Sequence, residues 1–265
     1  NSTAAELQNP INENEPLLRG NLFRQLFTAI NSNVKKGYTS IKVFEAGNVF
    51  TKDKNGFSQL LHLSGMIYHH EPQQTWSQKE LTYNFYSLKA EISKLLQTLG
   101  MQNIKFQKAS FLMPFNENAL DVFIGKHKIA VIGEVDLSVT EKLIKKPAYG
   151  FEIYPENISI VSSNPKIKKT SKFPLSSRDI NIVIDKSIAY REVESCIDKG
   201  SIKFLTSFSL INTFEGKDIP KGSLSMTLRV VFQSNVKSLS ESDINDSMQM
   251  TVKLLEKRLN AKIRS

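Results

Sequence analysis

The stretch LINTFEGKDIPKGSLSMTLRVVF, from Leu210 to Phe232, decides the fold of the C-terminal part of the chain. Two apolar runs flank a turn with Gly216, Pro220 and Gly222, residues typical of the connection between paired strands. The second run alternates with a period of two, which places on one face the apolar residues Leu224, Met226, Leu228, Val230 and Phe232. We therefore predict a hairpin in a sheet with one buried and one solvent-facing side.

The segments around this hairpin complete a recognisable order. Residues Ser177 to Asp185 alternate like a strand, and Ala189 to Ile197 are expected to form a helix. Ser240 can cap a long helix whose apolar stripe consists of Ile244, Met248, Val252, Leu255 and Leu259. A short last strand, Ala261 to Arg264, gives β-α-β-β-α-β, the ferredoxin-like arrangement, in which both helices cover one face and leave the other open.

The predicted open face carries polar residues and one aromatic ring. The alternation assigns to it Asp179, Asn181, Ser225, Thr227 and Arg229. If the alternation is reset at the adjacent apolar pair Leu210 and Ile211, Asn212 and Phe214 join them. A ring beside amides and hydroxyls on an open sheet suits unpaired nucleotide bases, although an ordinary solvated face with one exposed Phe explains the same composition.

Four phrases of the C-terminal region carry a family resemblance: FPLSSRDINIVID, FEGKDIPKGSLSMTLRVVFQS, SLSESDINDSM and LNAKIRS. In this order and spacing, Phe173 to Ser265 resembles the ferredoxin-like anticodon-binding domain that ends the beta subunit of bacterial phenylalanine–tRNA ligase. Where that family usually has Asp-x-Tyr before the turn, with both polar side chains facing the anticodon, this chain has Asn212 and Phe214. Ser225 and the pair Arg178–Asp179 match the family. The resemblance implies tRNA-binding roles for Arg178, Asn212, Phe214, Ser225 and Arg229.

The N-terminal region predicts a second domain. Helices are expected from Leu22 to Val34, from Phe85 to Gly100 and, briefly, near Val139 to Lys145. Strands are expected at Ile41–Phe50, Leu60–His70, Ile104–Phe111, Ala119–Gly125, Lys128–Val135 and Gly150–Tyr154. Strands that follow one another with few helices favour an α+β domain with a mainly antiparallel sheet. We assign residues 1–160 to this domain, 161–171 to a linker and 172–265 to the ferredoxin-like domain.

The N-terminal domain resembles the same subunit, in its class II synthetase-like core. The phrases are NPINENEPLLRGNLFRQLFTAINSN and IKVFEAGNVF. Working class II cores bring arginines from separate motifs to the ATP phosphates. Within residues 1–160 the only arginines are Arg19 and Arg24, both at the start of one helix. We therefore expect a catalytically silent core that holds no cofactor. The resemblance implies a catalytic alpha chain as partner, in a heterotetramer whose reaction uses ATP and Mg²⁺.

Composition and charge limit the remaining possibilities. The net charge is +9, and 18 Lys and Arg stand against 11 Asp and Glu from Val161 onward, which favours a polyanionic partner or simply a basic soluble domain. No run long enough to span a membrane and no signal peptide is present, so a cytoplasmic protein is expected. The lone Cys196 excludes an internal disulfide, and the sequence begins without Met, as a piece of a longer protein would.

Other chemistry has little support in the sequence. His69 and His70 are adjacent and would point to opposite faces of a strand, so a metal site with His62 is not expected. No P-loop or nucleophile-elbow pattern occurs, and we predict no catalytic residues. Two alternatives stay open: a free-standing RNA- or protein-interaction module, and a small ferredoxin-like hydrolase, for which Arg178 lacks an evident companion.

Overall fold

The computed structural model describes residues 17–53, 56–69, 83–110, 113–140, 144–158, 171–198 and 202–264. Its internal contacts divide the chain into two units, Asn1–Pro165 and Lys166–Ser265. The linker expected over residues 161–171 lies almost wholly outside the described residues.

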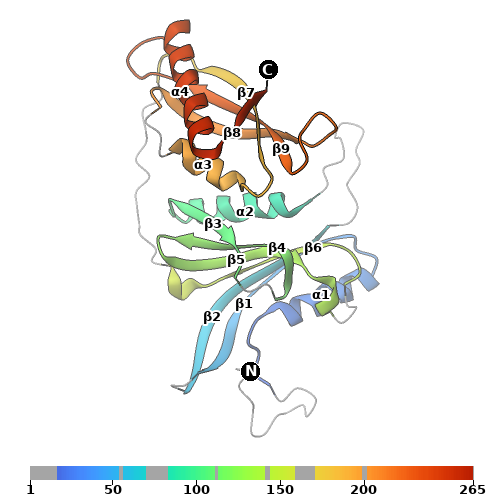
Figure 1. The fold of residues 1–265 in the computed structure, drawn as a ribbon. Coiled ribbons are helices and arrows are strands. Elements are labelled where there is room, and N and C mark those ends of the chain that lie inside the picture. The colour runs from blue at the N-terminus through green and yellow to red at the C-terminus, as the bar shows by residue number, and fades with distance from the viewer. Residues whose placement is uncertain are drawn as a thin grey trace. The chain divides into compact units, whose positions relative to one another are not determined.

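The N-terminal unit is built on a six-stranded antiparallel sheet with the strand order β1-β2-β6-β5-β4-β3 (Figure 1). Along the chain its elements are α1 (Phe23–Lys35), β1 (Ser40–Asp53), β2 (Gly56–His69), α2 (Phe85–Thr98), β3 (Ile104–Lys108), β4 (Phe115–Ile124), β5 (His127–Val135), the 3-10 turn η1 (Leu137–Thr140), β6 (Ala148–Ile153) and the 3-10 turn η2 (Pro155–Asn157). The α+β architecture expected from the sequence is confirmed. The short helix expected near Val139 to Lys145 is instead the 3-10 turn η1, and residues 141–143 lie outside the described part.

Each face of this sheet has its own apolar core, because side chains alternate along a strand. The neighbours Met66 and Ile67 on β2 show this: Met66 packs with α1, and Ile67 packs with α2. The helices contribute Phe23, Leu26, Phe27 and Ile30 from α1, and Leu88, Ile92 and Leu96 from α2. These buried apolar side chains anchor the two predicted helices to the sheet.

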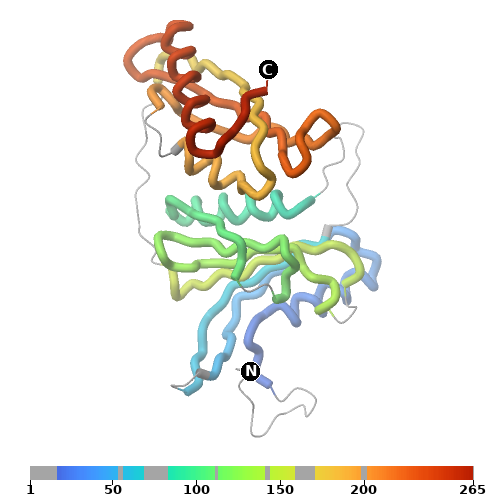
Figure 2. The backbone as a smooth tube through the Cα atoms, in the orientation of Figure 1, coloured from blue at the N-terminus to red at the C-terminus, as the bar shows by residue number. Residues whose placement is uncertain are grey.

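The hairpin of β1 and β2 extends beyond the rest of its sheet, as the blue and cyan tube in Figure 2 shows. Residues 56–62 of β2 pair with β1 alone, whereas residues 63–68 also pair with β6. Near the end of β1, the backbone amide of Phe50 donates to the carbonyl of Arg19, so the segment before α1 covers part of that edge.

The C-terminal unit has the predicted β-α-β-β-α-β order. Its elements are β7 (Ser176–Asp185), α3 (Tyr190–Asp198), β8 (Leu205–Phe214), β9 (Ser223–Phe232), α4 (Glu241–Leu259) and β10 (Lys262–Arg264). The four strands form an antiparallel sheet in the order β10-β7-β9-β8. The hairpin expected from Leu210 to Phe232 is confirmed as β8 and β9, which lie next to each other in this sheet.

Both helices of this unit pack on the same face of the sheet. The buried core joins Ile180, Ile182 and Ile184 of β7 and the apolar residues of β9 to Val193 and Ile197 of α3 and to Ile244 and Leu255 of α4. The predicted stripe of α4 is confirmed, with one addition. Ser247 and Thr251 are also buried, and each hydroxyl donates to a carbonyl four residues earlier, which satisfies the polar group inside the core.

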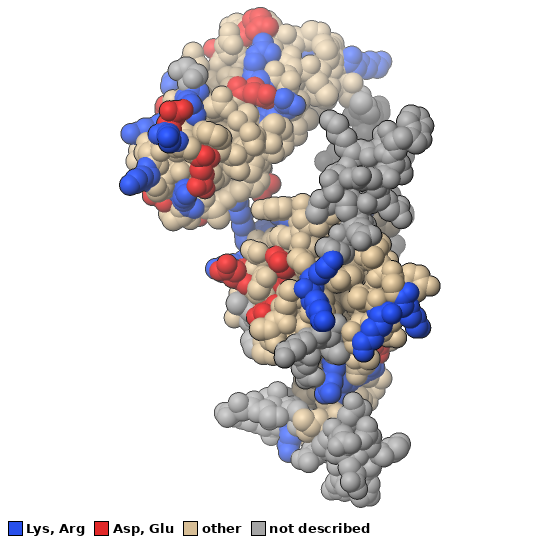
Figure 3. Space-filling model, turned by 90° about the vertical axis from the view of Figure 1, so that its right-hand side faces the viewer, with Lys and Arg blue, Asp and Glu red and all other residues tan. Residues whose placement is uncertain are grey.

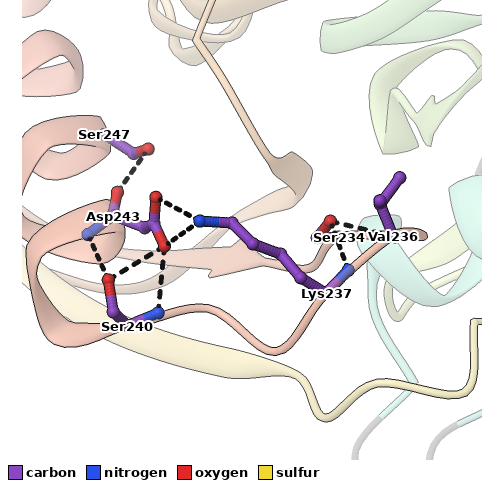
Figure 4. A network of polar contacts seen from close by, with 6 residues as sticks. All are labelled: Ser234, Val236, Lys237, Ser240, Asp243 and Ser247. Carbon is purple, nitrogen blue, oxygen red and sulfur yellow. Dashed lines mark hydrogen bonds and ion pairs between the residues drawn. The ribbon is translucent and has the colours of Figure 1, made fainter.

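A capping box fixes the start of α4 (Figure 4). The backbone amide of Asp243 donates to the Ser240 hydroxyl over 3.2 Å, and the Ser240 amide donates to the Asp243 carboxylate over 3.1 Å. The ammonium group of Lys237 donates to both carboxylate oxygens of Asp243, at 3.0 and 2.7 Å. These bonds stabilise the carboxylate form, and the Lys237 contact is the largest cause that lowers the pKa of Asp243 to about 2.

Replacing Ser240 by Ala removes the hydroxyl that accepts from the first turn of α4. We expect the Ser240→Ala variant to lose about 1 kcal/mol of α4 stability. Hydrogen exchange of the α4 amides in the full chain measures this loss. Ser238→Ala is the matched control, because Ser238 is exposed and no described contact involves its hydroxyl. Equal protection in both variants would contradict the capping role.

Asp243 should make the C-terminal unit sensitive to acid. Because its pKa is lower in the folded state than in the unfolded chain, its stabilising effect is present above about pH 4 and is lost as the pH falls toward about 2. Thermal melting at several pH values should therefore show a smaller acid-induced drop in Asp243→Asn than in the wild type. Asp246→Asn, which changes an exposed aspartate of the same helix, should keep the wild-type drop.

Candidate nucleic-acid interface

The face of the C-terminal sheet opposite α3 and α4 carries rows of side chains from neighbouring strands. In one row Asn181 of β7 lies opposite Thr227 of β9, and Thr227 lies opposite Asn212 of β8. In the adjacent row Val183, Ser225 and Phe214 follow the same order. These positions alternate with Ile182, Ile184 and Met226 of the core, so their side chains point to the other side.

Asn212 and Phe214 reach this face because β8 contains an irregularity. Leu210 pairs with Leu228 and packs on the core, but the next pair is Asn212 with Thr227, so Ile211 has no partner of its own. Such an extra residue reverses the alternation of the strand beyond it. The reset that the sequence allowed at Leu210 and Ile211 is therefore confirmed.

Phe214 and Ser225 are neighbours but differ in accessibility. The Phe214 side chain is 49% exposed, whereas Ser225 is only 6% exposed. The ring bends toward the turn, since a Cβ atom added at Gly216 would lie 2.5 Å from Cζ of Phe214. The ring is therefore available for stacking, and Ser225 lies largely covered beside it.

Two cross-strand contacts tie polar residues of the face to one another. The Arg229 guanidinium donates from Nε and Nη2 to the two carboxylate oxygens of Asp179, at 2.8 and 2.7 Å. The Thr227 hydroxyl donates to the side-chain oxygen of Asn181 over 2.7 Å. Hydrogen bonding by Arg229 lowers the pKa of Asp179 below its ordinary value, so the carboxylate is charged at neutral pH. The side-chain amide of Asn212 forms no hydrogen bond with another described residue.

Arg178 is not on this face. It alternates with Asp179 and so belongs to the helix side, where its Nη2 donates to both carboxylate oxygens of Glu241, at 3.0 and 2.8 Å. Glu241 is the first residue of α4. Of the five residues proposed from the resemblance, the structure thus brings Asn212, Phe214, Ser225 and Arg229 together and places Arg178 elsewhere.

Two cations on the open face were missed by the sequence reasoning. Lys262 lies opposite Val183, and Arg264 lies opposite Asn181, so both side chains join the polar rows from the edge strand β10. Both are exposed, and neither side chain forms a hydrogen bond or ion pair with another described residue. The three residues of β10 are too few to reveal by alternation which of them face outward. The register with β7 supplies that information.

The N-terminal unit has a buried polar group of different character. Nδ1 of His62 lies 3.1 Å from a carboxylate oxygen of Glu152, which also accepts from the Ser64 hydroxyl. Within the described residues no three His, Cys, Asp or Glu side chains are grouped so as to hold a metal ion.

Arg19, one of the two arginines noted in the sequence, forms an ion pair with Glu45 and donates to the carbonyl of Asn48. Among the described residues, no helix has the length and apolar character that crossing a bilayer needs.

Comparison with known families assigns both units. Residues 1–154 match the phenylalanyl tRNA synthetase beta chain CLM domain, and residues 171–264 match the ferredoxin-fold anticodon binding domain. The resemblance drawn from the sequence phrases is thereby confirmed.

Individual proteins agree with this assignment over almost the whole chain. The phenylalanine–tRNA ligase beta subunit of Lactobacillus acidophilus is 26% identical over 98% of the chain, and that of Wigglesworthia glossinidia brevipalpis is 27% identical over 100%. The chain spans 33% and 34% of these two relatives. A solved pyrrolysyl-tRNA synthetase from Desulfitobacterium hafniense covers 58% of the chain, and the chain covers 50% of it, with 16% identity and a TM-score of 0.44, too low to support any inference. With both units matched, the chain belongs to the family of phenylalanyl-tRNA synthetase beta chains.

Proposed function

We propose that the open face of the C-terminal unit binds the anticodon loop of a tRNA. Phe214 stacks on an unpaired base, and the free amide of Asn212 bonds to the edge of a base. Lys262 and Arg264 contact phosphates from the β10 edge of the same face. The observation that carries this proposal is the register, which aligns on one sheet surface a half-exposed ring with an amide and two cations that have no hydrogen-bond or ion-pair partner among the described residues.

The other residues of the predicted site would act differently. Ser225 lies opposite Phe214 and is covered, so it supports the ring more than it offers a hydroxyl. Arg178 acts indirectly, because its bonds to Glu241 join β7 to the start of α4. Arg229 lies on the face with its guanidinium held by Asp179.

Removing the ring should weaken tRNA binding by the value of one stacked base, about 1–3 kcal/mol, which corresponds to roughly 5- to 150-fold in Kd. We expect this loss in the Phe214→Ala variant, measured with the full chain and a transcript of the phenylalanine tRNA by gel shift or fluorescence anisotropy. Phe57→Ala, which removes another exposed ring from the N-terminal unit, is the matched control and should bind normally.

A second variant moves the ring without removing it. In Gly216→Ala the new methyl group occupies the place of the Phe214 ring edge, so the ring must shift. We expect tRNA binding weaker than in the wild type and stronger than in Phe214→Ala. Wild-type binding in both variants, or equal binding of RNAs without an anticodon loop, would refute an anticodon-reading face.

We propose further that the N-terminal unit is a structural core that supports a catalytic alpha chain, with both chains working in the cytoplasm. The relatives are beta subunits of a ligase for phenylalanine and tRNA, and the chain spans a third of their length, so the activity of the whole ligase is part of this proposal. The alpha chain would bind ATP and Mg²⁺. In keeping with this division, the Arg19 guanidinium is already engaged by Glu45 and Asn48.

An exposed apolar surface on the N-terminal unit offers a place for such a partner. Phe44, Phe57 and Leu61 are 77%, 66% and 53% exposed and lie on one face of the β1–β2 hairpin, where the register alternates them with inward residues. Exposed apolar groups gathered on one surface of a soluble protein commonly mark a contact with another protein.

Charging this surface should disrupt the partner contact. We expect a catalytic alpha chain, coexpressed with the wild-type chain, to copurify with it and to be lost from the double variant Phe44→Asp, Leu61→Asp. Tyr86→Asp, which charges an exposed aromatic residue of α2, should retain the alpha chain. If the wild-type chain binds tRNA but never retains an alpha chain, the free-standing RNA-binding module is the better description.

A further inference from the structure

The positive charges on the open face are not equivalent. Arg229 shares two hydrogen bonds with Asp179, directly opposite it in the register of β7 and β9. The side chains of Lys262 and Arg264 on β10 form no hydrogen bond or ion pair with another described residue. Figure 3 shows the same mixture more widely, with blue Lys and Arg side chains lying beside red Asp and Glu side chains on the surface of the C-terminal unit. The cations that could bind a phosphate without leaving an ion pair are therefore only some of the cations on the face.

Asp179 and Arg229 form a bidentate contact. Two parallel bonds join a planar guanidinium to a carboxylate, the geometry in which arginine also binds a phosphate. A phosphate that takes the Nε–Nη2 edge of Arg229 must replace Asp179, and one that binds the remaining N–H groups lies close to the Asp179 carboxylate, whose negative charge opposes it. Both side chains are about half exposed, so the exchange is open to solvent and is opposed by electrostatics more than by burial.

We propose that Asp179 is a specificity-determining residue of the RNA-binding face, because it masks Arg229 from the phosphates of the RNA. This inference rests on the proposed anticodon binding. Among the cations that the described strands present on this face, masking leaves Lys262 and Arg264 for sequence-independent phosphate contacts. The selection of RNA then depends more on Asn212 and Phe214, whose contacts are made to bases. Phosphate contacts add affinity for any RNA, and base contacts distinguish one sequence from another.

Loss of Asp179 would have the opposite effect on RNA binding if Arg229 contacted the RNA directly. If Arg229 bound a phosphate while Asp179 held its guanidinium in place, loss of Asp179 would weaken RNA binding. If Asp179 masks Arg229, its loss frees one cation and strengthens binding to any RNA. The sign of the change therefore separates the two roles.

The experiment compares two RNAs on the full chain: a transcript of the phenylalanine tRNA, and the same transcript with its three anticodon bases changed. Affinities are measured by fluorescence anisotropy at several salt concentrations for the wild type, Asp179→Asn and the double variant Asp179→Asn, Arg229→Gln. Glu256→Gln, which removes the same charge from an exposed position on α4, is the charge-matched control. Thermal melting checks that each variant is folded.

We expect Asp179→Asn to bind both transcripts more tightly, with the larger gain for the altered anticodon, so that the ratio of the two affinities falls. The slope of log affinity against log salt should steepen by about 0.7, the value for one phosphate contact on a single strand. Adding Arg229→Gln should remove the gain, and Glu256→Gln should leave both affinities and the slope near wild-type values.

Several results would overturn the inference while leaving anticodon binding intact. These are weaker or unchanged binding in Asp179→Asn, a gain that persists in the double variant, or an equal gain in Glu256→Gln, each in a chain whose binding still depends on Phe214. If the wild-type chain does not distinguish the two transcripts and Phe214→Ala binds normally, the proposed function itself fails, and the inference fails with it.

Discussion

One-sided burial in the C-terminal sheet is the constraint on which the candidate interface depends. The apolar faces of β7 and β9 are covered by α3 and α4 together, because both crossovers of the β-α-β-β-α-β chain return on the same side. Every side chain that alternates with this core must then face away from the helices. The polar rows through Thr227 and Ser225 follow from that burial. The surface proposed to contact RNA is thus the reverse side of a hydrophobic core.

The two units use their sheets in different ways. In the N-terminal unit α1 and α2 cover opposite faces of the six-stranded sheet, and Phe44, Phe57 and Leu61 are exposed on one face of the β1–β2 pair. In the C-terminal unit α3 and α4 cover one face only. This contrast is in keeping with the proposed division between a part that contacts protein and a part that contacts RNA.

Features with a strong local period could be predicted from the sequence. The alternation of β9 and the Ser240 cap of α4 each depend on a pattern of residues within a short stretch of the chain. Features that depend on residues far apart in the chain could not be predicted. The partner of Arg178 is Glu241, 63 residues away, and the outward positions of Lys262 and Arg264 follow from pairing with β7. Ser225 lies between Val183 and Phe214 in the register and is 6% exposed, which the alternation of β9 alone does not report. For β8 the sequence allowed a reset of the alternation at Leu210 and Ile211, and the pairing with β9 shows that the reset occurs.

The unpaired Ile211 determines how this surface responds to a change in the length of the chain. Loss of that single residue would place Asn212 directly after Leu210, so their pairing with Thr227 and Leu228 would follow a regular alternation, and Asn212 and Phe214 would still face away from the helices. One codon can therefore be lost at this position without exchanging the groups that this end of β8 presents. Chain length here can vary while Asn212 and Phe214 keep their outward positions.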